Sequence, residues 1–369
     1  MREPEASGMN AKEELVRIFD DKGGDSHPPA IFTQTGTVGQ MASSGASWPE
    51  ANFVPEKMAA LALEASKAFG FATARIPYCI TVDASAFGCE IAPGTASSQP
   101  SVRGSRYRGD GFFEDVPGDL ISPREFLESP RVSAVLDAAG ILSRHEDLFL
   151  VSGMNGPVAC INNLLGIENV LMALMTMPEK VTAWLEAVTP RLNAYSEALS
   201  EASDDVMIVE EATSELIPAD CFDTVFTPYL PQVIRSAKSS FCTTHSCGDT
   251  LEVAERLAGL GMDGISLEAS SDPQAYIDMV HGQTLMLGCV NPVGTLLMKG
   301  PKDVVAEARR SAEYGFQIVT PECGVPPLTP DGNLFVLAHY REYRFRQSSK
   351  SPVPGFAIQK RMAVPPARP

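Results

Sequence analysis

Short apolar runs alternate with longer segments of helical hydrophobic spacing through the second half of the chain. The short runs are rich in β-branched residues and predict strands at 148–153, 206–211, 241–245, 264–268, 285–290 and 316–320. The longer segments predict helices at 159–177, 179–202, 218–239, 250–260, 273–281, 302–314 and 330–346. This alternation is typical of βαβ units built on a parallel sheet.

The first half of the chain adds two predicted strands and a polar region. The strands are at 30–34 and 73–82, and helices are predicted at 13–20, 56–69 and 126–140. With about eight βα units in one chain, we expect a closed (β/α)8 TIM barrel rather than an open sheet. The barrel is expected to form a single domain over residues 1–346, with an N-terminal helical extension and a polar insertion at 93–118. Residues 347–369 are Pro-rich and are expected to be a disordered tail.

Composition and charge narrow the classes of function. Apolar residues make up 44% and charged residues 20% of the 369 residues, which is typical of a globular protein. The net charge of −17 argues against nucleic acid or an anionic membrane surface as the main partner. No apolar run reaches the roughly 18 residues of a membrane helix. The eight scattered cysteines and the polar N-terminus favour a reducing cytoplasm.

The candidate chemistry lies where predicted strands end. His245 and Cys247 end one strand and, being two residues apart, point to the same side. Cys323 follows a later strand, and the carboxyl ends of barrel strands meet at one face. One imidazole and two thiolates suit zinc, and three protein ligands leave a fourth position open, as in catalytic sites.

The residue pattern leaves two questions about these three residues open. Cysteine is often a plain buried hydrophobic residue, so the thiols could belong to the core instead. A fourth ligand could come from Glu210, which we take as a tentative metal ligand, or from its neighbour Glu211. Glu268 ends another strand and has the same ambiguity between a ligand and a solvated acid.

Several motifs resemble one known family along most of the chain, from about residue 13 to residue 346. Beyond His245-Ser-Cys-Gly-Asp249 and Cys323-Gly-Val-Pro-Pro327, the matching stretches are 34–37, 45–50, 75–78, 87–90 and 163–166. In these stretches the sequence resembles the methylcobamide:coenzyme M methyltransferases, the zinc-dependent branch of the uroporphyrinogen decarboxylase superfamily. The resemblance implies that His245, Cys247 and Cys323 bind Zn²⁺ and are the catalytic set.

The resemblance also implies an activity. A methylated corrinoid (methylcobamide) would donate a methyl group to a small thiol such as coenzyme M. The corrinoid would be carried by a corrinoid protein that docks at the barrel mouth. The thiol would be activated as a zinc-bound thiolate. Alternatives are a corrinoid enzyme that demethylates a small substrate onto Co(I), one that uses tetrahydrofolate as acceptor, or a non-catalytic corrinoid- or zinc-binding accessory protein.

Porphyrinogen decarboxylation is disfavoured, because residues 30–50 contain no Arg or Lys to neutralise the substrate carboxylates. The oligomeric state is left open.

Three polar side chains at predicted strand ends are candidate substrate-binding residues. Gln34, Tyr78 and Asn291 could each orient the thiol or a sulfonate. Each could equally cap a turn or hold a loop in place.

Overall fold

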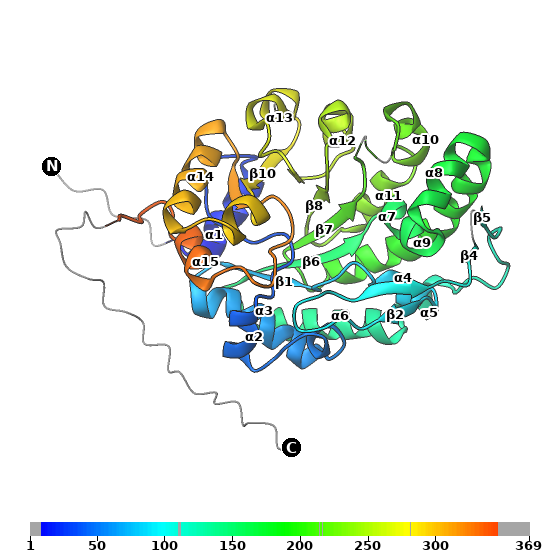
Figure 1. The fold of residues 1–369 in the computed structure, drawn as a ribbon, viewed down its shortest axis with the longest axis horizontal. Helices are drawn as coiled ribbons and strands as arrows, with labels where there is room; N and C mark the ends of the chain where they lie inside the picture. The colour runs from blue at the N-terminus through cyan, green and yellow to red at the C-terminus, as the bar shows by residue number, and fades with distance from the viewer. Residues whose placement is uncertain (1–8, 110–111, 214, 216, 281, 346–369) are drawn as a thin grey trace, which may run out of the picture.

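A twisted parallel sheet runs through the centre of the molecule. The computed structural model describes residues 9–109, 112–213, 215, 217–280 and 282–345. The seven sheet strands have the order β1-β6-β7-β8-β9-β10-β11, and the neighbouring pairs are parallel (Figure 1). They are β1 (Thr73–Ile76), β6 (Phe149–Asn155), β7 (Asp205–Glu210), β8 (Phe241–Ser246), β9 (Gly264–Leu267), β10 (Leu285–Val290) and β11 (Ile318–Pro321).

The expected first barrel strand at 30–34 does not form a regular ladder, so the described sheet has seven strands rather than eight. Its segment makes one isolated bridge, between Pro29 and Val319 of β11. On its other side the N–H of Ile31 donates to Oγ1 of Thr73 in β1, at 2.9 Å, rather than to a backbone carbonyl. Proline at 29 has no N–H to donate to a ladder. The segment therefore lies between β11 and β1, and the sheet is a TIM-like half-barrel.

Helices cover the outer side of the sheet, and several expected helices are divided (Figure 1). The expected helix 126–140 is divided before Pro130, and 159–177 is divided at Gly166, whose φ is +86°. The helices are α1 (Ala11–Asp20), α2 (Val38–Ser44), α3 (Pro55–Phe69), α4 (Val82–Ala86), α5 (Pro123–Leu127), α6 (Pro130–Leu142), α7 (Pro157–Leu165), α8 (Ile167–Thr176), α9 (Pro178–Ser200), α10 (Phe222–Val225), α11 (Leu230–Ser236), α12 (Ala254–Ala258), α13 (Pro273–Val280), α14 (Pro301–Tyr314) and α15 (Asp331–Ala338). Short turns of helix are η1 (Glu50–Asn52), η2 (Ala219–Cys221), η3 (Leu251–Val253) and η4 (Pro292–Leu297).

The polar region at 93–118 contains parts of two small antiparallel hairpins. One pairs β2 (Glu90–Ala92) with β3 (Ser101–Gly104), and the other pairs β4 (Arg108–Gly109) with β5 (Phe112–Phe113). The expected tail at 347–369 lies outside the described residues. No single described helix has both the length and the apolar composition to cross a bilayer; α7 and α8 pass that test only as a pair bent by 107°.

Buried apolar side chains pack together near the amino ends of the sheet strands. Phe149, Met207 and Ile318 belong to one buried cluster there, together with Phe19 of α1. The ring of Phe19 stacks on Phe149 at 5.8 Å and on Phe241 at 4.6 Å between ring centroids. This packing closes one end of the half-barrel, so the polar side chains at the other end of the strands face the open mouth.

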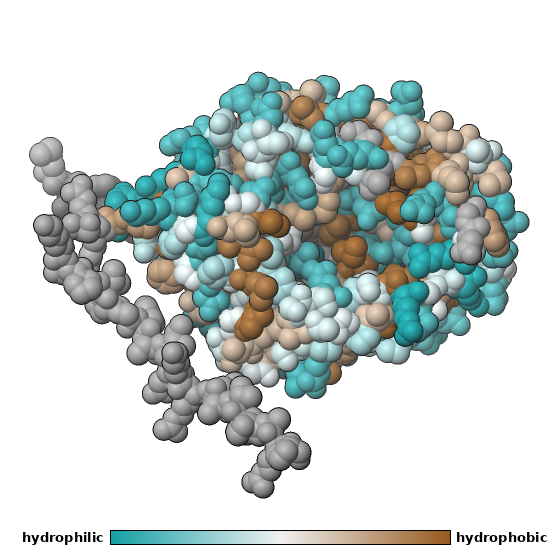
Figure 2. Space-filling view, viewed as in Figure 1, coloured by the Kyte–Doolittle hydropathy of each residue, from teal (hydrophilic) through white to brown (hydrophobic). Residues whose placement is uncertain are grey.

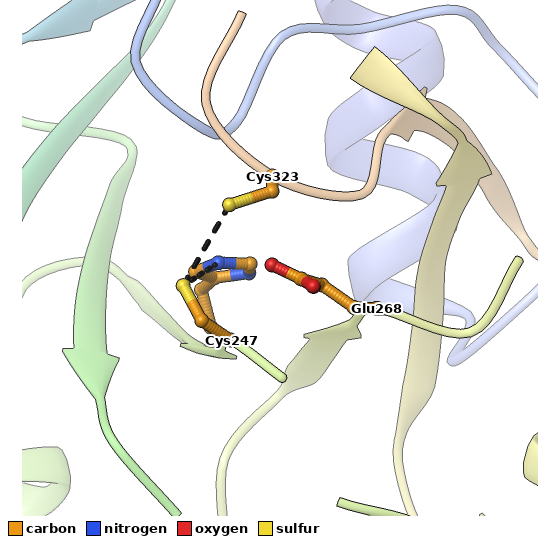
Figure 3. Close-up of side chains that lie close together, drawn as sticks. Cys247, Glu268 and Cys323 are labelled. Carbon is orange, nitrogen blue, oxygen red and sulfur yellow. Dashed lines mark hydrogen bonds between the residues drawn. The ribbon is translucent and has the colours of Figure 1, made fainter. Parts of the chain in front are cut away.

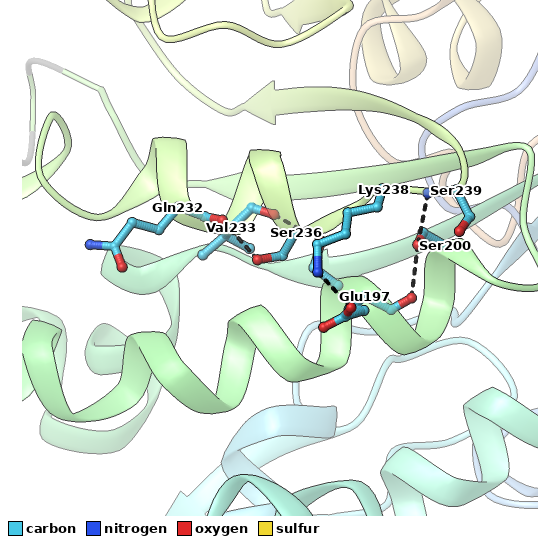
Figure 4. Close-up of polar contacts among 8 residues, drawn as sticks. Glu197, Ser200, Gln232, Val233, Ser236, Lys238 and Ser239 are labelled. Atoms are coloured by element: carbon cyan, nitrogen blue, oxygen red, sulfur yellow. Dashed lines mark hydrogen bonds and ion pairs between the residues drawn. The ribbon is translucent and has the colours of Figure 1, made fainter.

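Contacts between α9 and the segment before β8 fix where β8 begins (Figure 4). Lys238 pairs with Glu197 at 2.7 Å, and the N–H of Ser239 donates to Oγ of Ser200 at 3.3 Å. In addition, Oγ of Ser196 donates to the carbonyl of Val233 in α11 at 2.9 Å. These bonds hold the amino end of the strand that carries the candidate metal ligands.

Candidate metal centre

Four side chains from three strand ends converge at the mouth of the half-barrel. The ligand atoms of His245, Cys247, Glu268 and Cys323 all lie within 4.8 Å of one another. Figure 3 shows Cys247, Glu268 and Cys323 pointing toward a common point from β8, β9 and the loop after β11. The structure thus brings together the three residues that the sequence pattern selected, and it adds Glu268.

The distances within the cluster fit a tetrahedral ion. Nε2 of His245 lies 3.1 Å from Sγ of Cys247, and Sγ of Cys247 lies 3.6 Å from Sγ of Cys323. With Zn–S bonds of about 2.3 Å, two sulfur ligands of tetrahedral zinc lie about 3.8 Å apart. The S···S separation therefore matches a shared zinc ion, and the N···S separation would have to open by a few tenths of an ångström.

The electrostatics of the two thiols also favour a cation. The hydrogen bond with Cys247, together with burial, raises the pKa of the Cys323 thiol above its usual value. Without a cation the Cys323 thiol therefore keeps its proton, whereas a bound divalent ion deprotonates a coordinating thiol. The donor set of two sulfurs, one imidazole and one carboxylate is of the kind that zinc accepts.

Ser266 is a residue of this site that the sequence reasoning missed. It is fully buried in β9, and its hydroxyl lies 3.1 Å from Nδ1 of His245. The contact at Nδ1 leaves Nε2 to face the cluster. Glu268 directly follows β9, two residues after Ser266, so the alternation of side chains along this segment was the signal that pointed to both.

The loop that carries Cys323 is held on two sides. Oγ1 of Thr33 donates to the Cys323 carbonyl at 2.8 Å, and the N–H of Val325 donates to the Gln34 carbonyl at 2.9 Å. The Gln34 side chain lies directly against Gly324, where a Cβ would collide with its amide. Gln34 therefore lies next to the loop that carries Cys323, although the strand expected before it does not form.

Glu322 holds the other side of the same loop. This nearly buried carboxylate accepts hydrogen bonds from the N–H and hydroxyl of Ser270, at 2.7 and 2.6 Å. It also accepts from Nδ2 of Asn291, at 2.8 Å. Asn291 in turn caps η4 by accepting from the N–H of Gly294 at 2.6 Å. The Asn291 side chain is therefore engaged in supporting the loop.

The remaining two predicted site residues lie away from the cluster. Tyr78 is fully buried and donates its hydroxyl to the Met58 carbonyl at 2.7 Å. Glu210 is fully buried at the end of β7, and its carboxylate accepts from the N–H groups of Val158 and Ala159 at the start of α7. Burial raises the pKa of Glu210 to about 8. In this arrangement Glu268, rather than Glu210, contributes the carboxylate of the cluster.

Comparisons with known proteins identify the family of this chain. The sequence pattern of the family described as Uroporphyrinogen decarboxylase (URO-D) matches residues 10–343. The chain belongs to this family.

The similar curated proteins are methyltransferases. The chain is 32% identical over 342 residues to the methylcobamide:CoM methyltransferase MtaA of Methanosarcina barkeri, covering 91% of this chain and 98% of MtaA. It is 32% identical to the methylcobamide:CoM methyltransferase MtbA of Methanosarcina acetivorans, covering 88% of this chain and 95% of MtbA. A solved structure of a methyltransferase from Methanosarcina mazei superposes with a TM-score of 0.85 at 30% identity, over 90% of this chain and 98% of that one. This member of the URO-D family is accordingly a methyltransferase.

Proposed function

We propose that this chain transfers a methyl group from a methylated corrinoid, carried by a corrinoid protein, to a thiol such as coenzyme M. The observation that carries the proposal is the convergence of His245, Cys247, Cys323 and Glu268 at the open end of the strands. The names of the two relatives, which are methylcobamide:CoM methyltransferases, support the choice of donor and acceptor.

His245, Cys247 and Cys323 would hold a zinc ion, and Glu268 would complete its coordination when no thiol is present. Bound there, zinc supplies Lewis acidity that lowers the pKa of a coordinated thiol and makes its sulfur nucleophilic at neutral pH. Glu268 directly follows β9 and comes from a different strand end than the other three residues, so it could leave while they stay in place. Its departure would make room for the thiol.

The two cysteines also set the charge of the site. Their two thiolates balance the +2 charge of a zinc ion, so an incoming thiolate sulfur keeps its electron density. An all-histidine site would withdraw more of that density and weaken the nucleophile. The set of Cys247 and Cys323 with His245 therefore suits alkyl transfer to sulfur better than activation of water.

The methyl-transfer step balances without an added redox partner. The thiolate sulfur forms a bond to the methyl carbon as the Co–C bond of the Co(III) corrinoid breaks. The electron pair of that bond stays on cobalt, which leaves as Co(I), and the product is a methyl thioether. The chain's own part is to present the sulfur at the mouth.

The shape of the mouth supports a protein-bound donor. In the space-filling view the face is hollowed near its centre, and apolar side chains border the hollow (Figure 2). Leu328, in the loop that follows Cys323, is 67% exposed, and Val38 is 43% exposed where its N–H donates to the Pro327 carbonyl. A corrinoid protein that delivers its cofactor to the cluster would contact the loop after Cys323, where Leu328 is exposed.

The direct test uses the zinc-loaded protein with free methylcobalamin. Loss of the methylcobalamin spectrum is followed with coenzyme M, with other small thiols and with tetrahydrofolate, and the methylated product is identified by mass spectrometry. We expect a methyl thioether only when a thiol is present. Methyl transfer to tetrahydrofolate in place of thiols, or no consumption of methylcobalamin with any acceptor, would overturn the proposal.

A further inference from the structure

A cavity lies beside β10, apart from the metal cluster. Its volume is about 450 Å³, and none of the four cluster residues lines it. It is bordered by the start of α13, by η4 and by one side of α14. The residues that line it include Ser271, Cys289, Lys299, Glu307, Arg310 and Tyr314.

The cavity faces the helices and not the interior of the half-barrel. Its floor includes Cys289 and Ser311, which are 3% and 1% exposed. Oγ of Ser311, on α14, accepts from the N–H of Cys289 at 2.6 Å and donates to the carbonyl of Gly288. These bonds join the end of β10 to the helix outside it. The cavity is therefore separate from the space into which His245 and Cys247 project.

Two cations on the wall of the cavity lack partners within the described part of the chain. Neither Lys299 nor Arg310 makes an ion pair or a side-chain hydrogen bond there, and both are exposed. The one acidic side chain on the wall is Glu307, and its carboxylate already accepts from the N–H of Asn291 at 2.8 Å. In a chain with a net charge of −17, two cations facing one cavity without acidic partners form a local positive site.

Hydroxyl donors stand beside these cations. Ser271 and Tyr314 also line the cavity, and their hydroxyls make no hydrogen bond to any other described residue. Guanidinium, ammonium and two hydroxyls together offer more donors than a planar carboxylate can accept, whereas a phosphate group offers three oxygens in several directions. Arginine in particular matches phosphate with two parallel hydrogen bonds.

We propose that this cavity binds the phosphate group of a small phosphorylated molecule, through Lys299, Arg310 and the hydroxyls of Ser271 and Tyr314. The volume is within the range of sites for whole small ligands, about 300–1,000 Å³, so the phosphate would occupy one part and the rest of the molecule the remainder. The cavity wall also includes Ser270 and Asn291, the two donors to Glu322 beside Cys323. A ligand here contacts the network that supports the loop of Cys323.

The test is a titration of the full-length, zinc-loaded protein with inorganic phosphate. Binding is measured by ³¹P NMR, and its location by hydrogen–deuterium exchange of segments 270–276 and 291–300. We expect saturable binding, slower exchange in both segments, and dissociation constants at least about tenfold higher in Arg310→Gln and in Lys299→Gln, as expected when a charge-assisted hydrogen bond is lost. Arg235→Gln is the matched control, because it removes one exposed arginine from α11 on another part of the surface.

The outcomes separate a specific site from general attraction and from phosphate bound to zinc. Equal weakening in Arg235→Gln, or binding that is unchanged in both cavity variants, would overturn the proposal. Protection that appears only at 245–249 and 323–325 would place the phosphate on the metal and would also overturn it. Methylcobalamin turnover in Arg310→Gln is expected to match the parent protein, so the result does not depend on the proposed methyl transfer.

Discussion

The hydroxyl of Ser266 lies 3.1 Å from Nδ1 of His245, and both residues are buried on neighbouring strands of the sheet. In the β8–β9 ladder they are directly paired residues. The pairing sets the orientation of the imidazole ring, so Nε2 faces Cys247 at 3.1 Å. The geometry of the proposed metal site thus depends on a strand that contributes Ser266 as well as Glu268.

Replacing Ser266 should weaken zinc binding without unfolding the protein. In Ser266→Ala the ring loses the partner that fixes its orientation, and such losses typically lower metal affinity by about 10- to 100-fold. Zinc affinity is measured by competition with a chromogenic chelator. Ser266→Thr keeps the hydroxyl and should restore most of the affinity, whereas equal affinity in Ser266→Ala and the parent protein would show that the contact has no role in metal binding.

Removing either thiol should abolish both zinc binding and methyl transfer. Cys247→Ala and Cys323→Ala each leave too few ligands for a stable site. Metal content is measured by elemental analysis, and activity by the consumption of methylcobalamin with coenzyme M. Cys242→Ala is the control, since Cys242 is a buried thiol of the same strand outside the cluster. Full thiol methylation by a metal-free Cys323→Ala protein would contradict the proposed role of zinc.

Glu268 and Glu210 can be told apart as candidates for the fourth ligand. If Glu268 holds the position that the thiol needs, Glu268→Ala should keep one zinc ion at reduced affinity and should lower the KM for the thiol, because a competing ligand is gone. Glu210→Gln should leave zinc affinity unchanged, because Glu210 bonds to the start of α7. The reverse pattern, with zinc affinity changed only in Glu210→Gln, would make Glu210 the ligand.

The pH dependence of stability should change in Glu210→Gln. Burial raises the pKa of Glu210 from 4.5 to about 8, so between these values the folded state binds a proton that the unfolded state releases. Its contribution to stability is therefore fully present below pH 4.5 and is lost as the pH rises through about 8.

Glutamine cannot titrate, so the variant should gain stability relative to the parent protein as the pH rises across this window. The gain is on the order of a few kcal/mol at its largest. Urea unfolding at pH 5, 6.5 and 8 measures it, with the exposed Glu252→Gln as control. A constant difference between variant and parent at all three pH values would mean that Glu210 does not titrate in this range.

The order of the strands and the convergence of His245, Cys247 and Cys323 followed from the sequence. Period-2 spacing put His245 and Cys247 on one side of a strand, and βα alternation put Cys323 at the same end of the sheet. These are local patterns, and a parallel sheet brings the carboxyl ends of its strands together whatever the details of packing. The family motifs then fixed the kind of chemistry, and the comparisons confirmed the family and the enzyme class.

Tertiary structure decided the rest, because it depends on which side chains compete for each contact. Glu210 and Glu268 both lie at strand ends. The Glu210 carboxylate accepts hydrogen bonds from two N–H groups of α7, whereas the Glu268 carboxylate lies close to the thiols. The hydroxyl of Tyr78 is bonded to the Met58 carbonyl, and the segment expected to be the first strand joins β11 by a single bridge at Pro29. Sequence spacing determines which side of a strand a side chain faces. Only the packed fold determines which group that side chain contacts.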